Sequence, residues 1–404
     1  MGHAKISWLL GGLLCLLIVP AGCSTDETQW ERLYAAGRTA YQTGRYTEAE
    51  EHILAAVREA ERFGEQDPRF LSSLSNLAAI YHAQGRYAEA EPLFKRAIAI
   101  GEKALGPDNP EVVQSVLNLG KLYEEKGQYS QAEPLYKQTL KVREAALGSR
   151  HPRVAQSLNS LGGLYFVLGK HGEAEPLFQR ALAIQEDALG PNHPQVAVSL
   201  TNVALLSQAQ GKYAEAEALL KRAIAIDEKA LGPEHPHMGI ILNNLAGLYL
   251  DQGKYTEVEA LLKRAIAIDE KALGAGHHRV AIRLNNLARL YRIQGRAREA
   301  EALLKRAIAI DEEALGGDHL HVAIGFHNMA GLYHDQANYK LAEQFYQRSL
   351  AIREKALGPD HRSLAAVLEN YADLLRKMNR EAEAEKLDSR AKAIRDKHAQ
   401  EDSR

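Results

Sequence analysis

The sequence predicts an all-α protein, a solenoid of stacked antiparallel helix pairs, and two observations lead to this fold class. First, the dipeptide Leu-Gly recurs at 105–106, 147–148 and 189–190, and the step of 42 residues continues to 357–358. Second, apolar residues between these markers follow helical spacing in two runs per repeat. Neither helix of such a pair buries its apolar stripe alone, so we expect the pairs to stack.

The stretch 235–274 shows one repeat unit in full. Its first helix carries an apolar stripe spaced i, i+3, i+4 and i+7, made by Leu242, Leu245, Ala246 and Tyr249. Gly253 follows, a residue suited to the left-handed turn that ends many helices. The second helix is longer and ends at Gly274, and its stripe comprises Tyr255, Val258, Leu262, Ala265 and Ile266.

The markers also delimit the array. Gly-x-Tyr keeps the same step through most of the chain, weakens at 337–339 and 379–381, and lies one residue short at 44–46. We therefore expect about nine repeats over residues 30–397, with a divergent first repeat, and a polar tail over 398–404. The last helix, from Arg380 to about His398, is very polar, as suits the solubilising end of an array.

The N-terminus reads as a secretory signal over residues 1–22, followed by a short tether over 23–29. A positive charge at Lys5 precedes the apolar run 6–19, which is too short to span a bilayer comfortably. The order Pro20-Ala21-Gly22-Cys23-Ser24 resembles the lipobox of bacterial lipoproteins, although Pro20 departs from the usual leucine. This resemblance implies a lipid on Cys23 and an outer-membrane protein facing the periplasm. A cleaved signal with a secreted or periplasmic product, or an uncleaved anchor, is the alternative.

Charge and cysteine usage exclude several classes of function. Lys plus Arg number 50 and Asp plus Glu number 52, so no overall field attracts nucleic acid. The two cysteines, Cys15 and Cys23, precede the repeats, which therefore have no disulfide, thiolate nucleophile or cysteine metal site. The repeats contain no phosphate-binding loop and no serine nucleophile elbow. We expect neither an enzyme nor a cofactor.

Histidine recurs in step with the repeat, which raises the question of a metal-binding ladder. Each histidine directly precedes an expected helix, often with proline at the first helical position, and successive copies lie one repeat apart: His151, His193, His235, His277, His319 and His361. We therefore interpret them as helix starts rather than metal ligands. Three further prolines, Pro92, Pro134 and Pro176, are expected in first turns, where their missing amide has no helical partner to lose.

The spacing of Leu245-Ala246, Tyr249, Gly253, Tyr255 and Val258 resembles the tetratricopeptide repeat. The long second helix and the linker Leu-Gly-Pro-x-His-Pro resemble the 42-residue variety of kinesin light chains and many bacterial proteins. The resemblance implies a right-handed superhelix whose first helices line a concave groove. It also implies protein–protein interaction, with an extended peptide or a partner helix in that groove.

One groove position carries a ladder of asparagines. We define the asparagine ladder as Asn76, Asn118, Asn202, Asn244, Asn286 and Asn328, with Ser160 as its break and Asn370 beyond it. A carboxamide both donates and accepts, so the ladder is suited to the backbone of an extended peptide. The alternative is that each asparagine bonds the neighbouring repeat and fixes the stacking. Asn243 lies next to the ladder on the same side.

The seventh and eighth repeats carry a local basic patch on this side. Asn285, Arg289 and Arg292 are spaced i, i+4 and i+7, and His327 and His334 lie at equivalent places in the next repeat. Because guanidinium groups suit carboxylates, we hypothesise that the groove prefers an acidic peptide here. The alternative is solvated arginines with ion pairs inside the repeat.

These features together predict a protein-binding adaptor in the bacterial cell envelope, held to the membrane by its N-terminal lipid. Two alternatives remain. One is a regulatory subunit of a separate envelope enzyme, and the other is a structural spacer with no groove ligand.

Overall fold

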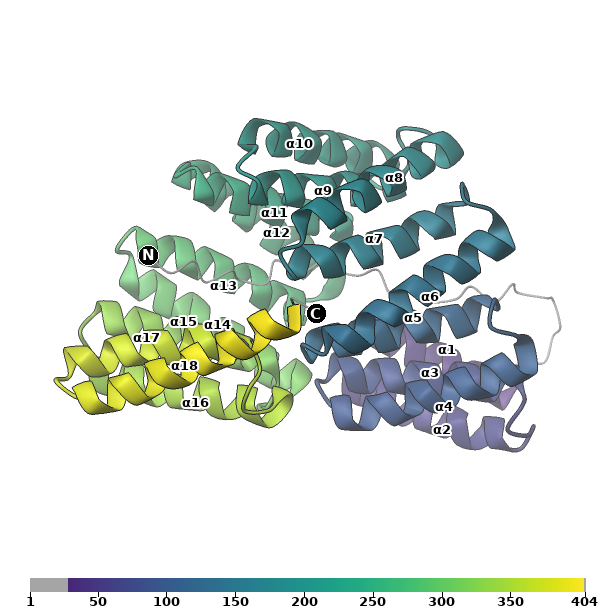
Figure 1. Cartoon of the computed structure of the whole chain (residues 1–404), viewed down its shortest axis with the longest axis horizontal. Coiled ribbons are helices and arrows are strands. Elements are labelled where there is room, and N and C mark those ends of the chain that lie inside the picture. Colours follow the sequence, from purple (N-terminus) through teal and green to yellow (C-terminus); the bar gives the residue numbers. More distant parts are fainter. Residues whose placement is uncertain (1–27, 403–404) are drawn as a thin grey trace. The chain divides into compact units, whose positions relative to one another are not determined.

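The computed structural model describes residues 28–402, and over this range the chain forms eighteen helices and no strand (Figure 1). In this range the helices follow one another as nine pairs. The chain divides into two compact units, whose described parts are residues 28–235, the N-terminal unit, and residues 236–402, the C-terminal unit. No helix in the described range is long and apolar enough to cross a bilayer.

The N-terminal unit contains the first five repeats. Its helices are α1 (Gln29–Gln42), α2 (Tyr46–Glu61), α3 (Pro68–Ala83), α4 (Tyr87–Leu105), α5 (Pro110–Glu125), α6 (Tyr129–Leu147), α7 (Pro152–Val167), α8 (His171–Leu189), α9 (Pro194–Ala209) and α10 (Tyr213–Ala230). The first repeat is the divergent one, since α2 has 16 residues where α4, α6 and α8 have 19.

The C-terminal unit contains the sixth to ninth repeats. Its helices are α11 (Pro236–Asp251), α12 (Tyr255–Leu273), α13 (His278–Ile293), α14 (Ala297–Leu315), α15 (Leu320–Asp335), α16 (Tyr339–Leu357), α17 (Ser363–Lys377) and α18 (Glu381–Asp402). The polar helix α18 thus runs to Asp402, into the stretch that the sequence suggested as a tail.

Within each unit the pairs stack as predicted. A first helix packs against the second helix of its own repeat and against the second helix of the repeat before it. First helices of successive repeats also contact one another, as α1 and α3 do in the N-terminal unit and α13 and α15 do in the C-terminal unit. The first helices therefore lie on one side of the stacked pairs, and the all-α solenoid is confirmed.

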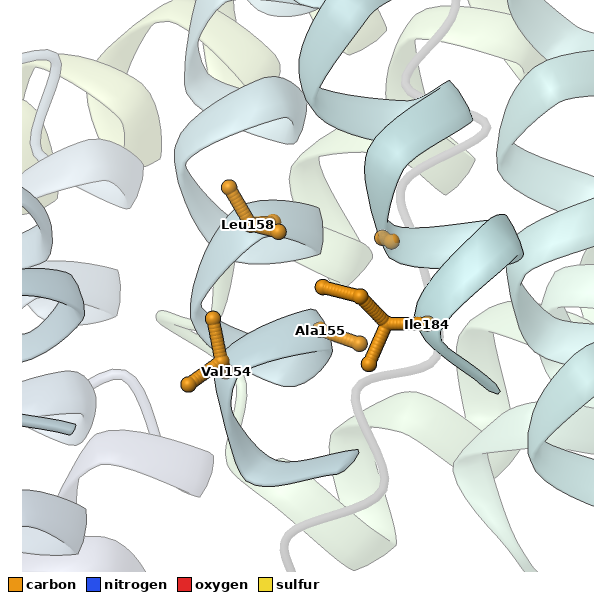
Figure 2. Close-up of a cluster of buried hydrophobic side chains, with 5 residues drawn as sticks. Val154, Ala155, Leu158 and Ile184 are labelled. Atoms are coloured by element: carbon orange, nitrogen blue, oxygen red, sulfur yellow. The ribbon is translucent and has the colours of Figure 1, made fainter. Parts of the chain in front are cut away.

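Apolar contact between neighbouring helices builds the core. Figure 2 shows one such cluster, in which Val154, Ala155 and Leu158 of α7 meet Ala181 and Ile184 of α8. All five side chains are buried. Burying a valine, leucine or isoleucine side chain is worth about 1.5–3 kcal/mol, so the same stripe repeated along the array supplies most of its stability.

The periodic histidines begin helices, as predicted. His151, His193, His277 and His319 are N-caps whose Nδ1 accepts the backbone N–H two residues on, at 3.1, 3.1, 3.2 and 3.1 Å. His361 makes the same contact with Ser363 N at 3.2 Å. These bonds satisfy amide groups that a helix start otherwise leaves without partners.

The three internal prolines contradict the sequence prediction. Pro92, Pro134 and Pro176 each lie five residues after the first residue of a second helix, in the second turn and not the first. The carbonyl four residues earlier, that of Ala88 for Pro92, therefore lacks its usual helical donor. The prediction was wrong because these helices begin at Tyr87, Tyr129 and His171, which makes each proline the sixth helical residue.

The turn inside each repeat requires a left-handed residue. Gly253 has φ +73°, and where the glycine marker is lost, Ala337 and Asn379 adopt φ +56° and +59°. A residue with a Cβ pays a steric penalty in this region. Asparagine tolerates this region, so the unfavourable residue is Ala337.

Ala337→Gly is therefore expected to stabilise the eighth repeat by about 1 kcal/mol, because the strain at this position disappears. Urea denaturation measures the gain. The matched variant Gly253→Ala creates the same strain two repeats earlier, and we expect a loss of similar size. A destabilised Ala337→Gly protein would contradict this account.

Candidate binding face on the first helices

The predicted groove residues lie on the first helix of each repeat. We call the side of these helices that carries Asn286, Arg289, Asn328 and the equivalent positions of other repeats the first-helix face. In the C-terminal unit the asparagine ladder joins successive repeats. Asn286 Nδ2 donates to Asn243 Oδ1 at 2.7 Å, and Asn328 Nδ2 donates to Asn285 Oδ1 at 3.0 Å. Asn285 also donates to the carbonyl of Ala281 at 3.0 Å. These bonds are the geometry that the stacking interpretation requires.

The stacking bonds leave part of each carboxamide unused. Asn286 and Asn328 are only half-buried, and each uses one amino hydrogen for the preceding repeat. Among the described residues neither Oδ1 has a hydrogen-bond partner. A carboxamide has two donors and an acceptor with two lone pairs, so each side chain retains a donor and an acceptor for a ligand. Their orientation is fixed by the bond to the neighbouring repeat.

The ladder is less regular in the N-terminal unit. Asn76 Nδ2 donates to the Tyr34 hydroxyl of the preceding repeat at 2.7 Å, whereas Asn118 Oδ1 accepts from Gln114 within its own helix at 3.0 Å. Asn202 is 3% exposed, and its Oδ1 has no hydrogen-bond partner in the part of the chain that is described. Asn244, in the C-terminal unit, is also buried. Asn286 and Asn328 are therefore the half-buried ladder positions that bond to an asparagine of the preceding repeat and still have a donor and an acceptor unused.

Arg292 reaches from the seventh repeat to the eighth. Its Nε lies 3.4 Å from Asp335 Oδ2, and its guanidinium covers Gly331, where an added Cβ would collide with Nη1. Both partners are more than a third exposed, so water screens the pair and its contribution is small. Asp335 thus offsets part of the positive charge that the sequence suggested here.

Arg289 has a different environment. It is half-buried, and no carboxylate among the described residues lies within ion-pairing distance of it. Burial is the main cause that lowers its pKa, and the nearby Arg292 adds to this, while Asp251 opposes it. The guanidinium of Arg289 has lost part of its hydration and has no ion-pair partner in the described range. A ligand carboxylate would therefore be stabilised more at Arg289 than elsewhere on this face.

The two histidines contribute no charge to the patch near pH 7. Burial lowers the pKa of His327 to about 3, helped by Arg353 and Arg292. Its Nε2 lies 3.3 Å from Asn370 Nδ2, which continues the inter-repeat bonds of the ladder. Burial also lowers the pKa of His334, with Asp335 and Asp373 acting in the opposite direction. The positive charge of the patch therefore comes from its arginines.

Sequence reasoning placed Ile240 on the groove side but missed the apolar row that it begins beside the ladder. Ile240, Ile282 and Ile324 lie one turn before Asn244, Asn286 and Asn328, and all three isoleucines are half-buried. Ile293, next to Arg292, is 45% exposed, the most exposed large apolar side chain of the described residues. The isoleucines repeat every 42 residues, so their period was a visible signal. The face therefore offers apolar contact beside hydrogen-bonding groups.

Metal chemistry has no support on this face or elsewhere in the described range, where no group of three or more His, Cys, Asp or Glu residues has the geometry to hold an ion. The predicted lipidation site, Cys23, lies outside the described residues.

Comparison with known families decides the kinship of the chain. The tetratricopeptide repeat profile matches seven segments, most of which overlap: residues 31–100, 69–145, 153–229, 199–271, 237–313, 279–355 and 321–397. The chain belongs to the tetratricopeptide repeat family. The family predicted from the sequence is thereby confirmed, and its matches extend over nearly all of the described helices.

Solved structures of similar proteins include repeat proteins of several kinds. A putative kinesin light chain with nearly identical TPR-like repeats, from Podosopora anserina, is 31% identical over 50% of this chain and 95% of its own, with a TM-score of 0.41. BtubC (BKLC) from P. vanneervenii is 23% identical over 61% of this chain and 94% of its own, with a TM-score of 0.45. A Rap protein complexed with competence and sporulation factor is 14% identical, covers 92% of this chain and 99% of its own, and has a TM-score of 0.60, which shows a shared fold. No curated protein matches the sequence.

Proposed function

We propose that this tetratricopeptide repeat protein is an adaptor that binds an extended segment of a partner protein on the first-helix face of its C-terminal unit. Tetratricopeptide repeats are typical protein–protein interaction scaffolds, and the repeats contain no motif of a catalytic site. Asn286 and Asn328 would bond the ligand backbone through their remaining donor and acceptor groups. Ile282 and Ile324 would contact its apolar side chains.

The half-buried Arg289 supports an acidic ligand. A carboxylate from the partner would accept two N–H bonds from its guanidinium, and charge-assisted bonds of this kind are stronger than neutral ones. The nearby Arg292 has only an exposed partner, Asp335, so a ligand carboxylate would compete for it at little cost. We therefore propose that the bound segment carries Asp or Glu opposite the seventh and eighth repeats.

Arg289→Glu is expected to weaken binding of acidic peptides at least tenfold. The probe is a displayed library of random linear peptides, selected on the immobilised protein and read by sequencing. Peptides selected by the natural chain should be enriched in Asp and Glu, and the variant should lose this enrichment. Binding of the best selected peptide is then titrated by fluorescence anisotropy.

Arg298→Glu is the matched control, because it changes the net charge equally at an exposed position on α14, away from the first-helix face. It should bind the selected peptides like the natural chain. If Arg289→Glu kept full affinity, or if both variants lost it equally, an acidic ligand at this site would be refuted.

The spacer alternative has its own support, because the ladder bonds of Asn243 with Asn286 and of Asn285 with Asn328 fix neighbouring repeats. Substituting these asparagines would disturb stacking and ligand together. Arg289 makes no such bond, so its substitution separates the two functions. A library that yields no peptide specific for the first-helix face would favour the spacer.

We also propose that the protein acts in the bacterial cell envelope, attached through a lipid on Cys23. The support is the likeness of residues 20–24 to a lipobox. Cys23→Ser is expected to move the protein from the membrane fraction to the soluble fraction after carbonate washing. The reason is that the variant lacks the lipid that we propose as its membrane anchor. Tight membrane retention of the variant would rule out this anchor.

A further inference from the structure

Four histidine rings meet where the seventh repeat joins the eighth. We call His277, His278, His319 and His321 the histidine quartet. The ring centroids of His277 and His278 are 4.4 Å apart, those of His278 and His321 are 5.9 Å apart, and those of His319 and His321 are 5.0 Å apart. The quartet therefore forms a continuous chain of imidazoles between the N-terminal ends of α13 and α15.

Two of these rings must be neutral to keep their place. Nδ1 of His277 accepts the N–H of Arg279 at 3.2 Å, and Nδ1 of His319 accepts the N–H of His321 at 3.1 Å. A protonated imidazole has two donors and no acceptor, so it cannot make this bond. It would also place a positive charge at the positive end of a helix dipole. Protonation therefore opposes both helix starts.

Two arginines and two buried carboxyl groups lie on the helices that carry or adjoin the quartet. Arg279 and Arg283 of α13 share one carboxylate, Asp269 of α12, whose oxygens lie 3.3 Å from each guanidinium. Asp311 has on α14 the place that Asp269 has on α12, and burial raises the pKa of this carboxyl well above its usual range. His237 of α11 holds the place that His321 holds on α15, and it is buried as well. A proton bound by His278 would therefore meet the positive charge of Arg279 as well as that of its protonated histidine neighbours.

We propose that the histidine quartet is an acid-sensitive joint, at which mild acidification loosens the contact between the seventh and eighth repeats. The rings pack closely at neutral pH. When protons bind, four neighbouring positive charges repel one another and two caps are lost, so the first turns of α13 and α15 separate. The joint lies at the end of the same two helices that carry Arg289, Arg292 and Asn328.

The direction of the effect follows from proton linkage. Burial lowers the pKa of His277 to about 4 and that of His278 well below its usual value, with the neighbouring histidines and Arg279 adding to the shift at His278. Both rings therefore bind protons more readily once the joint opens. The closed contact is fully stable above about pH 6.5 and weakens as the pH falls toward 4. For His277, a pKa of about 4 in the closed contact and of about 6.5 in the open one raises the equilibrium constant for opening about 30-fold at pH 5.

Other repeats of the same chain suggest variants that remove the quartet and keep the fold. The place of His278 is held by proline in several of them, such as Pro152 and Pro194, and the place of His321 is held by Gln195 in the fifth repeat. Proline suits the first helical position, where the backbone N–H has no helical partner. The variant His278→Pro/His321→Gln therefore retains both cap histidines and loses the chain of rings.

Hydrogen–deuterium exchange of the full chain at pH 7.5 and pH 5.0, corrected for intrinsic exchange rates, tests the joint. In the natural protein we expect at least a 100-fold loss of protection in the first turns of α13 and α15 at pH 5.0. The first turns of α7 and α9 are the internal control, since each has a single cap histidine, and they should change less. The double variant should match the natural protein at pH 7.5 and lose at most about 30-fold of its protection at pH 5.0, the share of the single cap histidine that each helix retains. Equal acid sensitivity of the variant, or unchanged protection in the natural protein, would overturn the proposal.

Discussion

Replacing Asp269 by leucine is expected to destabilise the contact between α12 and α13 by about 3–5 kcal/mol. Asp269 is fully buried and Arg283 is 5% exposed, with Asp269 Oδ2 and Arg283 Nε 3.3 Å apart. The substitution leaves the guanidinium buried without its counter-charge. Burial raises the pKa of Asp269 and lowers that of Arg283 to about 10, so each group already bears a cost of desolvation in the natural protein. Urea denaturation and hydrogen exchange of α12 and α13 measure the loss.

The double variant Asp269→Leu/Arg283→Met separates two contributions to the free energy of unfolding: the cost of leaving one charge buried and unpaired, and the net stabilisation by the ion pair itself. Removing both charges restores an apolar contact, and buried pairs replaced in this way often lose little stability. The ninth repeat has Val367 at the place of Arg283, and this valine is buried. We expect the double variant to recover most of the loss. A double variant as unstable as Asp269→Leu would show that packing, not charge, explains the first result.

The fold was predictable because the repeat period carries it. Once Leu-Gly and Gly-x-Tyr recur in phase, each helix needs only its apolar stripe and its turn glycine to be placed, and the cap histidines follow from their position before each stripe. The prolines of the second helices were assigned to the wrong turn, although the stripe that begins at Tyr255, the equivalent of Tyr87, already places Pro92 in the second turn.

The sequence predicts which residues lie on the binding face, but it does not predict which residues they bond or pair with. Helical periodicity places Asn286, Arg289 and Arg292 on one side of α13. Their partners come from other repeats: Asn286 bonds Asn243, and Arg292 pairs with Asp335. Such pairs depend on side-chain rotamers and on the offset between stacked helices, which a sequence period does not specify. The environment of Arg289 was hidden for the same reason, because its burial depends on what the neighbouring repeats place around it.

Phe178→Ala is expected to cost about 3–5 kcal/mol, as do other truncations of buried phenylalanines. Phe178 of α8 is 2% exposed, and its ring fills the space above Gly162 of α7, where an added Cβ would lie 2.8 Å from ring carbon Cε1. Truncation empties this space, and the surrounding helices relax only in part. Because a repeat contacts only its neighbours, we expect hydrogen exchange to show the loss in α7, α8 and the helices adjacent to them.

In the next repeat the same contact between the two helices is made by residues of different size. This pair provides the control for Phe178→Ala. Ala204 of α9 and Leu220 of α10 hold the places of Gly162 and Phe178, and both are fully buried. Gly162→Ala/Phe178→Leu reproduces that pair, so the smaller side chain makes room for the added methyl group. We expect the double variant to stay within about 1.5 kcal/mol of the natural protein, as volume-conserving exchanges do. Gly162→Ala alone keeps the phenylalanine ring, so it should be less stable than the double variant even though alanine is the better helix former by about 1 kcal/mol. If Gly162→Ala alone were the more stable of the two, the fit between these two helices would not depend on matched size.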